Sequence, residues 1–298
     1  QRVIEMLCRV RCTARVASEF RYEDPIVEPD DLCIVISQSG ETADTLAAMR
    51  QAKQAGAFTI AIVNVVASTI AREADGVLYT WAGPEISVAT TKAYSAQLAT
   101  LYLIAGRMAF ARGLMSEDQQ HTFCQQLGEL PEKLKQMLQC KETMQYLATR
   151  YHNRASVFFL GRGLDYAAAM EASLKLKEIS YIHSEAYAAG ELKHGTISLI
   201  EDGTLVVALA TQPELYEKTM SNIREVTSRG AEVILIAGVD FDGDESACRH
   251  IIRLPVCPAR FSASLSIVPL QLLAYYIAVE RNCDVDKPRN LAKSVTVE

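Results

Sequence analysis

The sequence predicts an α/β protein in which two similar domains follow one another. Short apolar runs rich in β-branched residues alternate with longer amphipathic stretches, and one strand–helix–strand pattern occurs twice. Continuous apolar runs are typical of parallel strands buried on both faces, and their alternation with helices gives βαβ order. The length of 298 residues fits two domains, at about 150 residues each.

The predicted elements follow from these patterns in order. The apolar runs predicted as strands are 32–36, 58–63, 76–79, 157–160, 205–209, 233–236 and 250–254. The amphipathic stretches predicted as helices are 42–55, 90–112, 166–181, 214–229 and 264–281. Between the two halves, residues 113–154 are charged, Gln-rich and helical in pattern, and Pro131 suits the first turn of a helix there.

The internal repeat indicates a duplicated domain. The first copy reads Asp31-Leu-Cys-Ile-Val-Ile, followed by a helix, Gly56 and a second strand. The second copy reads Asp202-Gly-Thr-Leu-Val-Val-Ala, followed by a helix, Gly230 and a strand. The offset of about 170 residues is too long for a solenoid and suits two copies of one domain. We therefore expect one domain at 1–145, with a helical linker from about 113, and a second at 146–298.

Composition excludes several classes of protein. The net charge of −6 argues against a nucleic-acid partner, because phosphate backbones attract basic faces. The uncharged stretch 261–279 has the length of a membrane span, but Ser, Pro and Gln interrupt it, so we expect a buried segment and no membrane partner. The eight Cys form no C-x-x-C or zinc-spaced cluster, which predicts reduced thiols and no metal site.

The N-terminus carries no targeting signal. Gln1 and the residues after it form neither a signal h-region nor an Arg-rich transit peptide. The reduced thiols favour a cytoplasmic protein. The chain also opens inside a helical pattern and without Met, as expected of a fragment.

The passage Ser37-Gln-Ser-Gly-Glu-Thr42 predicts a phosphate site. It joins a parallel strand to a helix, where open α/β sheets bind ligands, and Gly40 permits close backbone approach. The N–H groups at the start of the helix and three hydroxyls supply neutral hydrogen-bond donors, and the helix dipole favours a negative charge there. The alternative is an elaborate helix N-cap. The second copy reads Ala210-Thr-Gln-Pro-Glu214 and lacks most of these groups, so we expect ligand binding in the first copy alone.

Gly161-Arg-Gly163 follows a strand and resembles the start of a dinucleotide fingerprint. The third Gly is absent because residue 166 is Tyr, so the pattern favours a tight turn near a ligand over a nucleotide site.

The helix 166–181 places Glu171, Lys175 and Glu178 on one stripe. Apolar residues occupy much of the remaining surface, which predicts a buried helix whose stripe lines a polar site. There a carboxylate beside a lysine can move protons. An exposed ion-pair ladder is the equally open alternative. His194, in a following loop, is the histidine best placed for proton transfer.

Four passages together resemble the isomerase half of the glutamine–fructose-6-phosphate aminotransferases, also called glucosamine-6-phosphate synthases. They are Ser37–Thr42, Leu174–His183, Glu185–Gly195 and Asp286–Glu298. The resemblance runs along the whole chain. It implies two tandem sugar-isomerase (SIS) domains, each a parallel sheet flanked by helices, with the first strand of the first domain missing.

The resemblance also implies residue roles. Ser37, Gln38, Ser39 and Thr42 match the phosphate loop, and Val88 and Thr90 match a segment that lines the sugar site. Glu178 matches the carboxylate that moves a proton between C1 and C2, with Lys175 close by. His194 matches the residue that opens the sugar ring from the neighbouring subunit, and Lys293 matches the lysine that forms a Schiff base.

The implied reaction makes glucosamine 6-phosphate from fructose 6-phosphate and ammonia, without a metal or organic cofactor. The implied partners are a second copy of the chain and the glutaminase domain of the full-length protein. Two alternatives stay open. One is a non-catalytic SIS-type phosphosugar-binding regulator, which has no need to combine Glu178, His194 and Lys293. The other, disfavoured by the incomplete glycine fingerprint, is a nucleotide-binding Rossmann protein.

Overall fold

A computed structural model describes residues 1–293 of the chain, so the last five residues of the 286–298 passage lie outside it. The chain forms two compact units. Unit 1 is Gln1–His121 with the chain from Asn290 onward, and unit 2 is Thr122–Arg289. The division falls inside the helical segment predicted as a linker. The domain bounds expected from the sequence, 1–145 and 146–298, stay a prediction.

Unit 1 contains a parallel three-stranded sheet in the order β1-β2-β3. Its elements are α1 (Arg2–Cys8), α2 (Ala17–Phe20), β1 (Leu32–Ser37), α3 (Ala43–Gln54), β2 (Phe58–Val63), α4 (Thr69–Glu73), β3 (Gly76–Tyr79) and α5 (Lys92–Ala111), followed by α6 (Glu117–Gly128), which crosses into unit 2. Val35, Met49 and Ile70 belong to the core between the sheet and helices α3 and α4. Ile34 packs with α1 and α5 instead.

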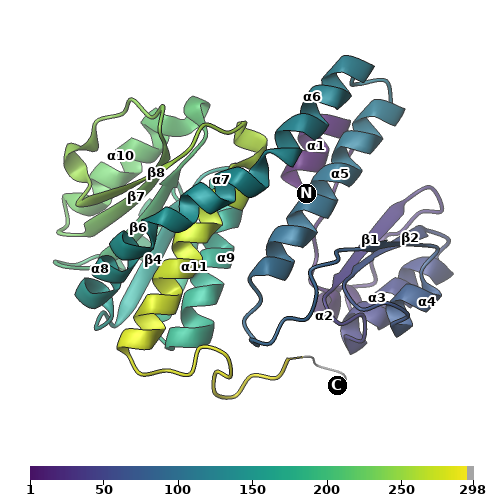
Figure 1. The fold of residues 1–298 in the computed structure, drawn as a ribbon, viewed down its shortest axis with the longest axis horizontal. Coiled ribbons are helices and arrows are strands. Elements are labelled where there is room, and N and C mark those ends of the chain that lie inside the picture. Colours follow the sequence, from purple (N-terminus) through teal and green to yellow (C-terminus); the bar gives the residue numbers. More distant parts are fainter. Residues whose placement is uncertain (294–298) are drawn as a thin grey trace. The chain divides into compact units, whose positions relative to one another are not determined.

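Unit 2 contains a parallel five-stranded sheet in the order β5-β4-β6-β7-β8. Its helices are α7 (Leu130–Met137), α8 (Lys141–Tyr151), α9 (Leu164–Ser180), α10 (Tyr216–Thr227) and α11 (Ser262–Glu280). Its strands are β4 (Ser156–Gly161), β5 (His183–Ala188), β6 (Leu205–Ala210), β7 (Glu232–Gly238) and β8 (His250–Leu254). Apolar residues of α10 pack on one face of the sheet, and α9 and α11 cover the other (Figure 1).

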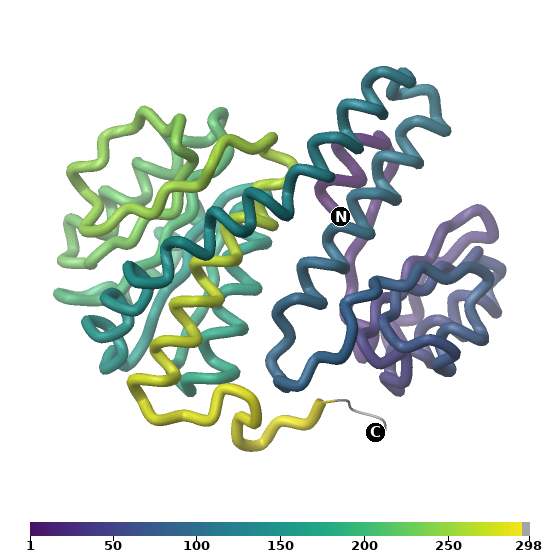
Figure 2. The backbone as a smooth tube through the Cα atoms, viewed as in Figure 1, coloured from purple at the N-terminus to yellow at the C-terminus, as the bar shows by residue number. Residues whose placement is uncertain are grey.

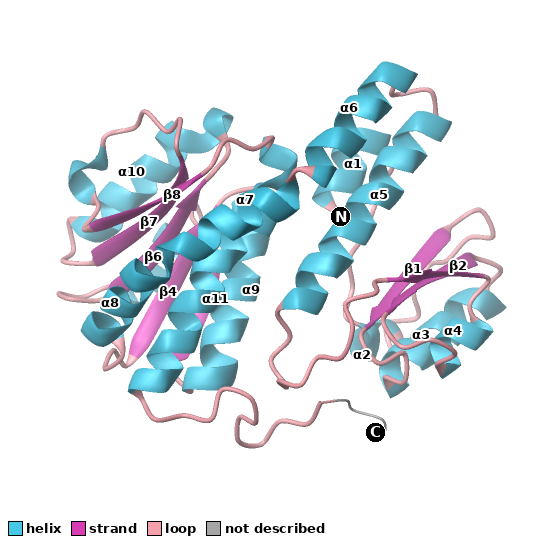
Figure 3. Cartoon of the chain, viewed as in Figure 1, coloured by secondary structure: helices cyan, strands magenta, loops and turns pink. Residues whose placement is uncertain are grey.

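Both sheets are parallel and flanked by helices, which confirms the predicted fold class (Figure 3). Strands β1 and β2 correspond to β6 and β7 in order, as the repeat predicts. The two sheets differ at one edge: β6 pairs with both β7 and β4, whereas β1 pairs with β2 alone among the described residues. This difference agrees with the expectation that the first domain lacks its first strand.

The predicted strands and helices are all present, with small differences at their ends. The sequence interpretation missed β5, His183–Ala188, and treated this stretch as the approach to a loop. The reason is its composition: it carries polar residues and forms the edge of the sheet, so the apolar run that marks a buried strand is absent.

Helix α11 accounts for the uncharged stretch. Ala259–Glu280 is long and apolar enough to cross a membrane, and 61% of the apolar window is buried inside the structure. The helix packs along α8 and α9, as expected of a core helix of a folded domain.

After α11 the described chain, from Arg281 to Lys293, forms no further helix or strand (Figure 2). The first part of this segment, up to Arg289, contacts the C-terminal end of α9. Arg281 Nε donates to the Ser180 carbonyl oxygen at 2.9 Å, and the Arg289 backbone N–H donates to the Tyr181 hydroxyl at 2.8 Å. The Arg289 guanidinium also lies 4.2 Å from the centre of the Tyr181 ring. The tail is therefore fixed up to Arg289 by contacts within unit 2.

Candidate active site

The loop after β1 is organised by its own hydroxyl groups. Ser37 Oγ accepts the Gly40 N–H at 3.0 Å and lies 2.8 Å from Thr42 Oγ1. Ser39 Oγ accepts the Glu41 N–H at 3.1 Å. Thr42 occupies the N-cap position of α3, yet its side chain caps no N–H group of the helix. Capping by Thr42 therefore does not explain the hydroxyls of this loop.

Gly40 is required because the loop passes very close to the start of α4. Its φ is +66°, and a Cβ added there would lie 2.0 Å from Ser68 Oγ. The Gly40 carbonyl accepts the Ile70 N–H at 3.0 Å. One carboxylate oxygen of Glu41 accepts the Thr69 N–H at 2.8 Å, and this hydrogen bond lowers the pKa of Glu41.

Two buried polar atoms at this loop lack a hydrogen-bond partner among the described residues. They are Gln38 Oε1 and Ser68 Oγ. Because buried polar atoms in folded proteins are nearly always hydrogen-bonded, these atoms mark a position that a polar ligand or water would occupy.

Gly40→Ala is expected to weaken phosphate binding. The added methyl group meets Ser68 and the residue must adopt an unfavourable φ, so the loop should shift. We expect an affinity for fructose 6-phosphate lowered by about tenfold, and a loss of about 1–3 kcal/mol in the free energy of unfolding. Calorimetric titration and urea denaturation measure the two effects. Gly113→Ala is the control, since its φ is also positive but its Cβ would meet nothing within 4 Å. Unchanged affinity in Gly40→Ala would contradict the role of this loop.

Asn64, directly after β2, links the three loops at the carboxyl edge of the unit 1 sheet. Its N–H donates to the Gln38 carbonyl at 3.2 Å. Its side-chain oxygen accepts from the Thr80 hydroxyl and the Ala82 N–H, and its side-chain nitrogen donates to the Gly83 carbonyl. The loop after β1 is thereby tied to the segment that leads to Val88, at the edge where α/β sheets bind ligands.

The segment before α5 contains Val88 and Thr90, which are both half-buried. One carboxylate oxygen of Glu85 accepts the Thr91 N–H at 2.9 Å, close to the start of the helix. Lys293 Nζ donates to the Ser87 carbonyl oxygen and lies 3.9 Å from the second carboxylate oxygen of Glu85. Unit 1 thus brings the predicted Schiff-base lysine to the predicted sugar-lining segment.

In unit 2 the charged stripe of α9 is buried rather than exposed. The Lys175 side chain is 6% exposed, and its Nζ lies 3.6 Å from Glu171 Oε1 and 2.6 Å from Glu178 Oε2, the latter in ion-pair rather than hydrogen-bond geometry. The side chain of Glu178 is 21% exposed. This excludes the exposed ion-pair ladder and leaves a carboxylate next to a buried lysine, an arrangement suited to proton transfer.

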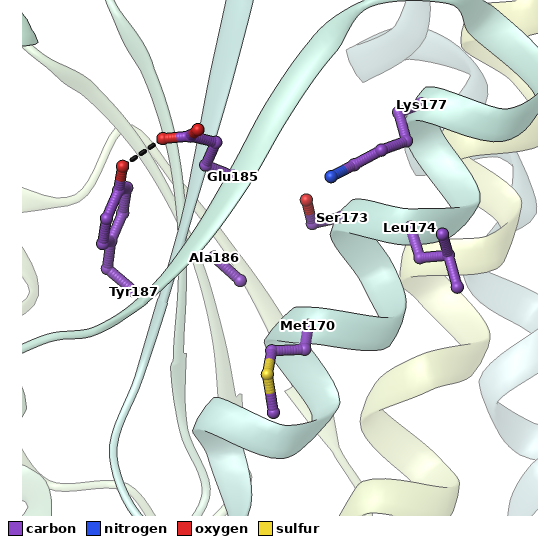
Figure 4. A pocket seen from close by; sticks show the side chains of 7 residues that line it. All are labelled: Met170, Ser173, Leu174, Lys177, Glu185, Ala186 and Tyr187. Atoms are coloured by element: carbon purple, nitrogen blue, oxygen red, sulfur yellow. Dashed lines mark hydrogen bonds between the residues drawn. The ribbon is translucent and has the colours of Figure 1, made fainter. Parts of the chain in front are cut away.

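The apolar side of α9 is less buried than the sequence predicts. Met170 and Leu174 are 46% and 41% exposed. With Lys177 of α9 and Glu185 and Tyr187 of β5 they line a pocket of about 420 Å³ (Figure 4). The Tyr187 hydroxyl donates to Glu185 there. None of the predicted site residues lines this pocket.

Burial raises the pKa of Glu171 to about 7, against the opposing effect of Lys175. A carboxyl that binds its proton more tightly when folded stabilises the fold at low pH and loses that contribution as the pH rises through the folded pKa. We expect the unfolding free energy of the wild type, relative to Glu171→Gln, to fall between pH 4.5 and 7, by at most about 1.4 kcal/mol per pH unit. Urea denaturation across this range measures it, and a difference that stays constant would contradict the assignment.

His194 ends a short 3-10 helix, Leu192–His194, and is exposed. Within residues 1–293, the side chain of His194 forms no hydrogen bond or ion pair with Glu178. The side chain of Gln212, from the loop after β6, packs against the turn Gly161–Gly163. Its Nε2 donates to the Arg162 carbonyl at 2.7 Å, and a Cβ added to Gly163 would lie 2.7 Å from its Oε1. The expected approach of a ligand to the turn stays a prediction.

Asn64 and Glu85 contact residues of the candidate site, and the sequence analysis did not select them. Asn64 could have been found, because polar residues that end parallel strands face the ligand edge. Glu85 gives no such signal, since its contact with Lys293 joins positions far apart in the sequence. Within residues 1–293, no group of three His, Cys, Asp or Glu residues is placed to hold a metal ion.

Comparison with known proteins gives a consistent result. The family model described as the SIS domain matches residues 2–107 and 150–281. The chain is 56% identical over 298 residues to a glutamine–fructose-6-phosphate aminotransferase (isomerizing) from Clostridium tetani, and 57% identical over 296 residues to one from Caldanaerobacter subterraneus. These alignments cover 99% of the chain but 48% and 49% of the relatives. The chain therefore spans about half the length of the curated relatives it matches.

Two solved structures show the same fold. The C-terminal domain of glucosamine-fructose-6-phosphate aminotransferase from Francisella tularensis is 36% identical with a TM-score of 0.90, over 96% of this chain and 82% of that one. Glucosamine-6-phosphate deaminase from Thermotoga maritima is 27% identical with a TM-score of 0.78, over 99% and 84%. The chain belongs to the SIS-domain family, as a member that matches the isomerase half of the glutamine–fructose-6-phosphate aminotransferases.

Proposed function

We propose that this chain performs the sugar half of glucosamine 6-phosphate synthesis, converting fructose 6-phosphate and ammonia to glucosamine 6-phosphate. The observation that carries the proposal is the buried Lys175 of α9 in contact with Glu178. A protein that merely binds sugar phosphates has no need of an acid–base pair held out of solvent, whereas an isomerase must move a proton between carbon atoms.

Substrate binding begins at the loop after β1. The hydroxyls of Ser37, Ser39 and Thr42, the Gln38 side chain and the N–H groups at the start of α3 bind the phosphoryl group. Val88 and Thr90 line the sugar. Neutral donors suffice because the helix dipole favours the anion. His194, supplied by a second copy of the chain, opens the sugar ring by proton transfer.

The reaction then proceeds at C2. The Lys293 amine adds to the C2 carbonyl, and water leaves as the imine forms. Ammonia displaces the lysine, forming one C–N bond while the other breaks. Glu178 removes a proton from C1 and returns it to C2, while the O1 proton is transferred to the imine nitrogen, giving a 2-amino aldose. This chemistry uses side chains alone and requires no metal or organic cofactor.

The proposed role of His194 requires a second copy of the chain. A homodimer supplies His194 to the neighbouring sugar, and the exposed imidazole is free to serve another copy in this way. A glutaminase domain in the full-length protein would supply the ammonia, and the reaction would take place in the cytoplasm.

The proposal is tested on the complete natural polypeptide that carries this sequence. Fructose 6-phosphate and ammonium are added, and glucosamine 6-phosphate is measured by mass spectrometry. Formation of product is the expected result. Binding of fructose 6-phosphate, seen as a raised melting temperature without product, would replace the enzyme by a phosphosugar-binding regulator. Saturable NAD binding without either effect would revive a nucleotide-binding protein.

A further inference from the structure

Glu85 lies between β3 and α5, and its carboxylate has an arrangement that the proposed reaction does not yet use. The side chain is 5% exposed. Its Oε1 accepts the Thr91 N–H at 2.9 Å, which fixes the orientation of the carboxylate. Its Oε2 is buried, has no hydrogen-bond partner among the described residues, and lies 3.9 Å from Lys293 Nζ.

A buried carboxylate is costly unless a cation or hydrogen-bond donors compensate for its charge. The neighbouring cation on the same segment, Lys92, is exposed and directs its Nζ to the Pro84 carbonyl at 2.6 Å. Lys293 is therefore the cation that Glu85 Oε2 faces. Lys293 Nζ meets two acceptors from one segment, the Ser87 carbonyl and the Glu85 carboxylate.

We propose that Glu85 is a positioning residue for Lys293, holding its amine for attack on the ketose and balancing the positive charge of the protonated imine. This inference rests on the proposed function of Lys293. In the step concerned, Lys293 adds to C2 as the free amine after giving up one proton. The carbonyl oxygen leaves as water with that proton and one of the two amine protons, so the imine nitrogen keeps one proton and carries the positive charge. A negative charge fixed beside that atom stabilises the positively charged iminium as it forms.

Glu85→Gln separates this role from simple structural support. Glutamine keeps an oxygen that can accept the Thr91 N–H but removes the negative charge facing Lys293. In the complete natural polypeptide, borohydride reduction with fructose 6-phosphate converts the imine to a stable adduct, measured by mass spectrometry. We expect the rate of adduct formation and kcat to fall by about a hundredfold, because positioning of a reacting group contributes effects of this size. The KM for fructose 6-phosphate should change less than about threefold, since the phosphate loop is unaltered.

Two matched variants complete the test. Glu73→Gln removes a carboxylate that pairs with Arg50 at 2.6 Å elsewhere in unit 1, and should trap the adduct like the wild type. Glu85→Asp keeps the charge on a shorter side chain and should recover part of the lost rate. It also tests the role if the Gln variant fails to fold by circular dichroism.

Three outcomes would overturn the inference: normal trapping in Glu85→Gln, equal loss in Glu85→Asp and Glu85→Gln, or a raised KM with unchanged kcat. The last would make Glu85 a substrate-binding residue. Failure of the proposed function has a different signature, because wild-type protein would then yield no adduct that depends on Lys293.

Discussion

We expect Lys293→Ala to abolish the borohydride-trapped adduct with fructose 6-phosphate and to lower product formation to background. The reason is chemical: the amine that forms the C2 imine is absent, and alanine offers no substitute nucleophile. Because covalent catalysis is lost entirely, we expect a decrease in kcat of at least about a thousandfold. Mass spectrometry of the reduced protein and an assay of glucosamine 6-phosphate measure the two effects.

Lys287→Ala is the matched control, since Lys287 lies on the same tail and its backbone N–H donates to Asp284 at 2.9 Å, a bond that alanine retains. It should trap the adduct normally. Lys287→Ala should keep the melting temperature, because this side chain is exposed. Lys293→Ala should lower the melting temperature, because the buried Glu85 carboxylate loses the cation that faces it. An adduct that persists in Lys293→Ala would place the imine on another lysine.

We expect Glu178→Gln to stop the reaction after the imine has formed, at the proton transfer from C1. Glutamine cannot accept the C1 proton, and removal of a general base costs about 10²–10⁴ in rate. Imine formation on Lys293 precedes this step, so we expect kcat to fall by that factor while the borohydride-trapped adduct still forms. Fructose 6-phosphate should bind with an affinity within a few-fold of the wild type. Product assays and adduct trapping on the same sample separate the two steps.

Glu232→Gln serves as the control in unit 2. It removes a partly buried carboxylate that pairs with Arg150 at 2.8 Å and Arg154 at 2.7 Å, far from α9 in the sequence. It should lower stability and leave turnover unchanged. If Glu178→Gln retained turnover close to that of the wild type, the proton transfer would have to be assigned to another group.

The strands that could be predicted from the sequence are those with continuous apolar runs. The run Leu205–Leu209 is wholly buried in β6, and the run Phe58–Val63 forms β2, so both were found from sequence. The edge strand His183–Ala188 was missed because it pairs only with β4 in the described sheet. An edge strand tolerates polar residues, so it lacks the apolar run of a buried strand. The same edge explains the exposure of Met170 and Leu174, which line the pocket beside β5.

The predictable part of the site is the part formed by one stretch of chain. The loop Ser37–Thr42 carries its donors in consecutive residues, and the stripe on α9 follows from helical spacing. Tertiary contacts decide the rest. The burial of Lys175, the filling of the Gly163 turn by Gln212 and the contact of Glu85 with Lys293 depend on how distant segments pack. Sequence periodicity and local motifs do not predict contacts between segments that are far apart in the sequence.

The loop after β1 is central to the account, because it fixes where the sugar phosphate lies. A crystal structure of the protein soaked in fructose 6-phosphate tests this most directly. We expect the phosphoryl group within hydrogen-bonding distance of the Ser37, Ser39 and Thr42 hydroxyls and of N–H groups at the start of α3. A phosphoryl group bound at any other loop, with these hydroxyls still bonded to one another, would contradict it.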